Sequence, residues 1–146
     1  MSRLTVNEAG TSGYTDQIIL TPSDFTTTAG NTTTLVNVPV KEGDVIDGVC
    51  LDITEAFSVS SNITIGGEAA ILPGSADPDG FIEAVNANAV AVKTNTGDLI
   101  DDGGEASNTR VVVVADGNIT INAATALDTS TSGKMRVLLS IKRVNF

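Results

Sequence analysis

The chain has 146 residues, with 18 acidic and 8 basic side chains, a formal net charge of −10, and no histidine or tryptophan. This negative balance repels a phosphate backbone and argues against nucleic-acid binding. The lack of histidine removes Ser–His–Asp and Cys–His catalysis, and the single cysteine, Cys50, removes an intramolecular disulfide and a cysteine zinc site. We therefore predict a protein that is not an enzyme, with no catalytic residues and no cofactor.

Residues 1–14 are predicted to form a flexible N-terminal arm, since Gly10, Ser12 and Gly13 interrupt any regular pattern. The arm has no apolar stretch of signal-peptide length, and no segment of the chain approaches the roughly 20 apolar residues that span a bilayer. We expect residues 15–146 to form a single domain that folds in the cytoplasm and has no membrane partner.

The first predicted strands cover residues 17–20, 32–40 and 45–54. They are rich in Val, Ile and Thr, whose branched Cβ atoms favour strands over helices. In the third segment apolar and polar positions alternate, which is typical of an antiparallel strand buried on one face. Its predicted buried face comprises Val45, Val49, Leu51 and Ile53.

The middle of the chain is predicted to contain a hairpin, a short helical segment and another strand. Residues 62–65 and 69–72 flank Gly66-Gly67, which is a strong turn signal. Residues 81–87 are expected to form one or two helical turns, and residues 88–94 a short strand.

The C-terminal third begins with RVVVVA, residues 110–115, a continuous apolar run that we expect to be central in a sheet or at an interface. Asp116-Gly117 predicts a hairpin turn into a strand over residues 118–123. The last predicted strand, residues 134–144, has a largely polar face and an apolar face. The apolar face comprises Met135, Val137, Leu139 and Ile141.

Together these segments predict an all-β protein of about eight to ten short strands with at most one short helix. Turn signals recur every few residues, and no long stretch has helical periodicity. We expect an antiparallel β-sandwich of the jelly-roll kind, with an open barrel as the alternative.

A metal site is one interpretation of the acidic residues in the middle of the chain. Asp77 and Asp79 supply two carboxylates, and Asp101 and Asp102 in a later acidic loop are candidates to converge with them. Calcium takes six or more oxygen ligands, and the regular spacing of an EF-hand loop is missing here.

A β-turn is the favoured interpretation of the same segment, ADPDG at residues 76–80. Pro78 and Gly80 are typical turn residues, and an aspartate side chain can bond to the backbone two residues on. Such a turn would reverse the chain and place Phe81 in the core.

Four of the eight basic residues lie close together near the C-terminus: Lys134, Arg136, Lys142 and Arg143. A solvated strand face is the first interpretation of this cluster, and contact with an acidic partner surface is the alternative. Together with Arg3 of the N-terminal arm, these residues are the candidates for partner binding.

Cys50 falls on the mostly polar face of its predicted strand. A buried, inert thiol is the default expectation for a lone cysteine. Partial exposure, or cover by a neighbouring subunit, are the alternatives.

Four segments in order carry a resemblance to a known class of proteins: VPVKEGDVIDGVCLDITEAF, SNITIGG, ADPDGF and GKMRVLLSIKRV. This order is similar to that in small β-sandwich structural proteins of tailed bacteriophages, particularly the head decoration, or cement, type. The resemblance runs from Val38 to Val144, and the ending Val144-Asn145-Phe146 departs from it, because a tyrosine is usual there.

The resemblance implies a virion protein that decorates and stabilises the capsid exterior. Its expected partners are further copies of itself, as a homotrimer, and the major capsid protein, and its expected location is the capsid surface. Two alternatives stay open, namely a tail- or fibre-associated receptor-binding module and a calcium-dependent adhesin or hydrolase domain.

Overall fold

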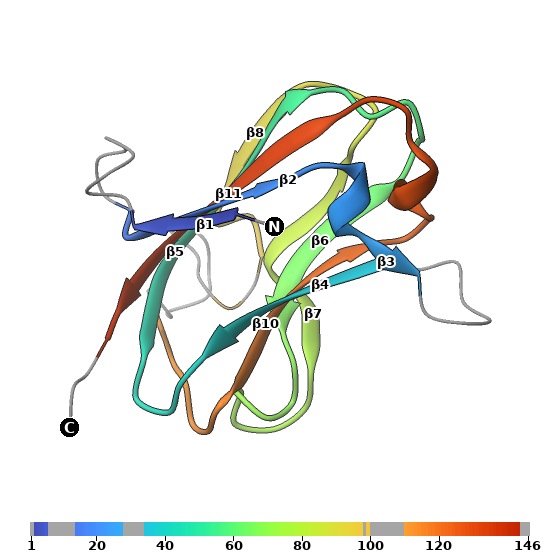
Figure 1. Cartoon of the computed structure of the whole chain (residues 1–146). Helices are drawn as coiled ribbons and strands as arrows, with labels where there is room; N and C mark the ends of the chain where they lie inside the picture. The colour runs from blue at the N-terminus through green and yellow to red at the C-terminus, as the bar shows by residue number, and fades with distance from the viewer. Residues whose placement is uncertain (1, 6–13, 28–33, 98, 100–109, 144–146) are drawn as a thin grey trace.

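Strands rich in branched-Cβ residues make up most of the protein. The structure is a computed structural model that describes residues 2–5, 14–27, 34–97, 99 and 110–143; for residues 2–5, 26–27 and 34–35 it describes the backbone alone (Figure 1). Two 3-10 helices, η1 (Pro22–Asp24) and η2 (Leu127–Thr129), accompany the strands. The strands are β1 (Ser2–Thr5), β2 (Asp16–Leu20), β3 (Thr26–Thr27), β4 (Thr34–Val40), β5 (Val45–Glu55), β6 (Asn62–Gly67), β7 (Asp77–Asn86), β8 (Ala91–Thr94), β9 (Val111–Val112), β10 (Gly117–Ala123) and β11 (Lys134–Lys142).

The strands form two antiparallel sheets that pack against each other. The first sheet has the order β1-β2-β11-β5-β8, with β9 also paired to β5, and the second has the order β3-β4-β10-β6-β7. When the short β1, β3 and β9 are left out, each sheet has four strands. The first and last of these eight strands along the chain, β2 and β11, are neighbours in the first sheet. This order is that of a jelly roll, so the predicted all-β sandwich is confirmed.

The core lies between the sheets and is built from alternate residues of each strand. On β11 the predicted apolar face is confirmed, because Met135, Val137 and Leu139 are fully buried and Ile141 nearly so. Each such side chain contributes about 1.5–3 kcal/mol when it leaves water. Phe81 is also fully buried, as expected.

Strand β5 departs from the simple alternation that its sequence predicts. Ser140 of β11 lies opposite Gly48, but the next residue, Ile141, lies opposite Ile46, so Asp47 is skipped in a β-bulge. Beyond a bulge, side chains that would have pointed to one face of the sheet point to the other. The prediction that Val45 faces the core is therefore wrong, and Ile46 is fully buried instead.

The hairpin predicted around Gly66-Gly67 is wrong, because both glycines belong to β6. A Cβ atom on Gly66 would lie 1.8 Å from the carbonyl oxygen of Asp77, so glycine permits a close approach of two backbones rather than a turn. The chain reverses in the following loop, residues 68–76, where Gly74 has a φ of +130°.

The turn predicted at ADPDG and the helical turns predicted at residues 81–87 are also wrong. Strand β7 covers most of both segments. Its register with β6 changes between the pairs Ile65–Ile82 and Gly67–Asp77, so β7 has extra residues there. Pro78 falls within this irregular stretch, which suits a residue with no N–H to donate to the ladder.

Residues 110–115 are not central in a sheet. Only Val111 and Val112 form a strand, β9, and it pairs with β5 at the edge of the first sheet rather than with β10. Strand β10 itself starts at Gly117 and pairs with β4 and β6, so the strand predicted for residues 118–123 is confirmed. The hairpin predicted at Asp116-Gly117 is wrong, because residues 113–116 carry the chain from the first sheet to the second.

The N-terminal segment contributes a strand to the first sheet. Ser2–Thr5, which lie within the arm predicted for residues 1–14, form β1 and pair with β2. Residues 1 and 6–13 of that arm lie outside the described residues. Among the residues that are described, no helix has the length and apolarity needed to cross a membrane.

Candidate interaction surface

Four large apolar side chains of the described residues are exposed, and all four lie within or just beyond β8 and β9. Their exposed fractions are 67% for Val90, 62% for Val92, 52% for Val112 and 45% for Val114. They lie in or next to β8 and β9, which both pair with the same side of β5. We call these four residues the valine edge.

The register shows why two of these valines face away from the core. Val92 lies opposite Asp52, and Val112 lies opposite Val45. Cross-strand partners share a face of the sheet, and both partners here point away from the second sheet. Val111 and Val113, the neighbours of Val112 in the chain, are buried, so the RVVVVA run alternates between core and solvent.

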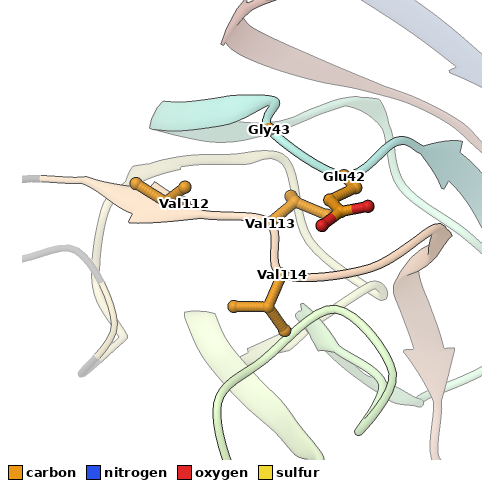
Figure 2. A pocket seen from close by; sticks show the side chains of 5 residues that line it. All are labelled: Glu42, Gly43, Val112, Val113 and Val114. Atoms are coloured by element: carbon orange, nitrogen blue, oxygen red, sulfur yellow. The ribbon is translucent and has the colours of Figure 1, made fainter.

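A hollow of about 540 Å³ lies beside the valine edge and is lined by Glu42, Gly43, Val112, Val113 and Val114 (Figure 2). The amide of Gly43 donates to the carbonyl of Val113 (2.9 Å), and the amide of Val113 donates to the carbonyl of Asp44 (2.8 Å). Figure 2 shows Val112 and Val114 projecting to different sides of this anchored backbone. Three valine side chains line the hollow, and Glu42 is the charged residue among its lining.

Two basic residues lie along the same edge. Lys93 is in β8 next to Val92, and Arg110 directly precedes β9. Both side chains are exposed, and neither forms an ion pair in the part of the chain that the structure describes. Lys93 lies opposite the buried Leu51, so it projects from the other face of β8 from Val92.

The predicted C-terminal basic cluster does not form one free patch, because three of its residues are paired with aspartates. Arg136 Nε lies 2.6 Å from Asp52 Oδ2, and Lys142 Nζ lies 3.1 Å from Asp47 Oδ2. Lys134 is exposed and has no ion pair among the described residues.

Arg143 is the third paired residue of the cluster. Arg143 Nη2 lies 2.7 Å from Asp16 Oδ2. Hydrogen bonds to Asp16 raise the pKa of Arg143, and the charges of Asp16 and Asp44 raise it further, against the opposing effect of partial burial. The backbone of Arg3 lies opposite Ile18 in β1, and its side chain lies outside the description.

The candidate metal ligands are not brought together in the described structure. Asp77 and Asp79 both belong to β7, and Asp101 and Asp102 lie outside the described residues. A Cβ atom on Gly80 would lie 2.8 Å from Asp77 Oδ2, so this carboxylate lies against its own strand. The part of the chain that can be described holds no group of three or more potential metal-ligating side chains.

Cys50 is buried, with 5% of its surface exposed, which confirms the burial expected for this thiol. It lies opposite Leu138 of β11, which is 4% exposed. Both residues belong to the outer face of the first sheet, where the Tyr14 ring would lie 3.7 Å from a Cβ atom placed on Gly48.

Half of the valine edge was visible in the sequence, because the RVVVVA run was expected at an interface if it was not central. The other half, Val90 and Val92, was missed. Their segment was predicted as a strand, but no local pattern says that this strand ends a sheet. An apolar strand with no strand beyond it is recognisable only once strand order is known.

Comparisons with protein-family models, with curated protein sequences and with solved structures gave no match for this chain.

Proposed function

We propose that this chain is a non-enzymatic structural protein of a bacteriophage virion, which decorates and stabilises the capsid exterior as a homo-oligomer. Its partners in this role are copies of itself and the major capsid protein. The resemblance of four ordered segments motivates the proposal. The observation that carries it is the valine edge, four exposed apolar side chains spread along one side of β5, since exposed apolar surface can serve as a protein-binding surface.

The fold is suited to such a role. A decoration protein needs a rigid body with adhesive surfaces and no chemistry. The jelly roll supplies a fully packed core, and its exposed side chains are free to serve recognition. Oligomerisation multiplies weak contacts, because once one subunit is bound the others face the shell at a high effective concentration.

Electron cryomicroscopy of purified virions tests the proposal. The expected result is density for the jelly roll at repeated positions on the outside of the head. Shells made without the protein, and then incubated with the purified chain, should regain that density and resist heating better than untreated shells. A chain found only in the tail would favour the receptor-binding alternative, and a chain missing from the particle would contradict a virion role altogether.

A further inference from the structure

We infer that a hollow on the outer face of the first sheet is a binding site for a carboxylate group, held by Gln17, Lys134 and Arg136. The hollow has a volume of about 360 Å³ and is lined by Gln17, Ile19, Thr54, Lys134, Met135 and Arg136. This volume lies at the lower end of the about 300–1,000 Å³ that is typical of small-ligand sites. The inference does not depend on the proposed function.

The strand register places the polar groups of this hollow on one face of the sheet. Arg136 of β11 lies opposite Ile19 of β2, and cross-strand partners share a face. Gln17 lies on the same face in β2, and Lys134 does so in β11, because residues two apart in a strand share a face. Met135, between the two basic residues, is fully buried in the core, so this face points away from the second sheet.

Arg136 is held in a fixed orientation and has one free nitrogen. Its Nε donates to Asp52 Oδ2 (2.6 Å), and its Nη1 donates to Gln17 Oε1 (3.3 Å). Nη2 forms no hydrogen bond within the described residues. A guanidinium that is already oriented loses less conformational entropy when it binds an anion.

Gln17 adds a nearly buried donor to the same hollow. The residue is only 8% exposed. Because only the oxygen of an amide accepts, the bond from Arg136 identifies the other end as Nε2, which has no hydrogen bond to any described residue. Among these residues Asp47 Oδ1 is the one buried side-chain oxygen or nitrogen without a partner, so Gln17 Nε2 is accessible from the hollow that Gln17 lines.

Lys134 supplies a second cation. Its side chain is exposed and forms no ion pair in the described part of the chain, although Glu55 lies opposite it in the register. None of the six lining residues is acidic, and Thr54 donates its hydroxyl to the carbonyl of Lys134 (3.2 Å). The nitrogen atoms that remain, Gln17 Nε2, Arg136 Nη2 and Lys134 Nζ, are all donors, so a ligand must supply acceptors.

A carboxylate fits these donors best. Its two oxygens accept up to about four hydrogen bonds, and those from charged donors are stronger than neutral ones. Asp52 already neutralises Arg136, which leaves Lys134 as the unpaired cation of the hollow in a chain with a net charge of −10. A singly charged carboxylate suits that balance better than a doubly charged phosphate. Ile19 adds apolar surface for the carbon chain that carries the carboxylate.

Nuclear magnetic resonance of the isotope-labelled full-length chain tests the inference, because the Gln17 side-chain amide and the Arg136 Nε–H give observable signals. The probes are sodium acetate and the blocked peptide acetyl-Ala-Glu-Ala-amide, which carry one carboxylate each, titrated against sodium chloride at equal ionic strength. Both probes are expected to shift both signals saturably, and chloride is not. Tighter binding of the peptide would identify a protein side chain as the source of the carboxylate, and tighter binding of acetate a small free acid.

Two results of the titrations would overturn the inference. One is tighter binding of sodium phosphate than of acetate. The other is the lack of a saturable shift up to about 100 mM of either carboxylate, because binding weaker than that is worth less than one charge-assisted hydrogen bond.

Three variants test the assigned residues, with the Arg136 Nε–H signal as the readout. Gln17→Glu keeps an oxygen for Arg136 but replaces the amide donor by a like charge, and it should weaken acetate binding by about tenfold or more. Lys134→Ala should weaken it by about two- to fivefold, as expected for an exposed ion pair. Lys142→Ala is the matched control, because it removes the same charge from the far end of β11, where Lys142 is paired with Asp47.

The Lys142→Ala variant should bind acetate as the wild type does, and the backbone amide spectrum should show the same fold for all three variants. Equal weakening by Lys134→Ala and Lys142→Ala would mean that only net charge matters, and it would overturn the site. A folded Gln17→Glu variant that binds as tightly as the wild type would do the same.

Discussion

Arg143 and Asp16 join the end of the last strand to the start of the second through a two-pronged ion pair. Arg143 Nη2 donates to Asp16 Oδ2 at 2.7 Å, and Nη1 donates to Oδ1 at 3.2 Å. The side chain of Asp16 is only 3% exposed, whereas that of Arg143 is 45% exposed. A buried carboxylate is costly unless it is paired, so the arginine is expected to stabilise this end of the sandwich.

Replacing Arg143 by alanine should lower the free energy of unfolding by about 1–3 kcal/mol, because a charged hydrogen-bonding partner of a buried group is lost. Arg143→Lys should fall between the variant and the wild type, since it keeps the charge but loses the paired geometry. Lys142→Ala is the control: the Lys142 side chain is 74% exposed, and its loss should cost no more than about 1 kcal/mol. Urea unfolding measures all three, and equal effects of the Arg143→Ala and Lys142→Ala substitutions would contradict a special role for the Asp16 pair.

Asp47 should contribute to the loss of stability in acid. Burial raises the pKa of Asp47, but hydrogen bonds from Ser140 and Lys142 and the charge of Lys142 outweigh it, so the folded pKa lies below the ordinary 3.8. A carboxyl whose pKa is depressed on folding stabilises the native state at pH values above its unfolded pKa. That contribution falls as the pH drops below about 3.8 and through the folded pKa.

The measurement is a comparison of the wild type with Asp47→Asn in urea unfolding from pH 2 to 7. The wild type should be the more stable at neutral pH, and the difference should shrink as the pH falls below 3.8. A difference that is constant over the whole range would mean that the ionisation of Asp47 is not coupled to folding.

Alanine substitutions at two glycines with similar φ angles, Gly133 and Gly74, should show how much stability is lost to backbone strain and how much to steric clash. Gly133 has a φ of +125°, and a Cβ atom there would lie 2.3 Å from the Phe57 ring. Gly74 has a φ of +130°, and a Cβ atom there would meet nothing within 4 Å. Phe57 is held in place by an edge-to-face contact with Phe25 at 6.2 Å, so its ring is not free to move aside.

Gly74→Ala should therefore cost about 1–2 kcal/mol, the strain of a left-handed conformation alone. Gly133→Ala should cost more, by about 1–3 kcal/mol of overpacking. Thermal unfolding of the two variants measures the difference. Equal melting temperatures would show that the core accommodates the added methyl group.

Metal removal should leave the protein unchanged. Asp77 and Asp79 alone cannot supply the six or more oxygen ligands that calcium needs. The melting temperature is expected to be the same in excess calcium and in excess EDTA, within the error of the measurement. A rise with calcium that is abolished by Asp79→Asn would contradict this expectation and support the calcium-dependent alternative.

The sequence predicted those parts of the fold that depend on local pattern. The apolar face of β11 and the strand at β10 follow from side chains that alternate over several residues, and a strand with one buried face has only one way to arrange them. The abundance of branched-Cβ residues gave the all-β class for the same local reason.

The errors fall where residues far apart in sequence meet. The bulge at Asp47 exchanges Val45 for Ile46 in the core, and it exists only because β11 pairs with β5. Gly66 looked like a turn residue, but the backbone it must approach belongs to Asp77. Glycine and proline signal an unusual backbone, and the sequence does not say whether that backbone is a turn, a bulge or a close approach.

By itself, then, the sequence determined an all-β protein of the sandwich class, an acidic surface and the main buried face of its last strand. Only the tertiary structure decided that Val90, Val92, Val112 and Val114 are exposed along one side of β5, and that Arg143 and Arg136 are paired with aspartates rather than free. Hydrophobic alternation is encoded locally, whereas strand order decides which residues end a sheet and which charges meet. Because strand order is a property of pairings between distant segments, the candidate surface emerged from the folded chain.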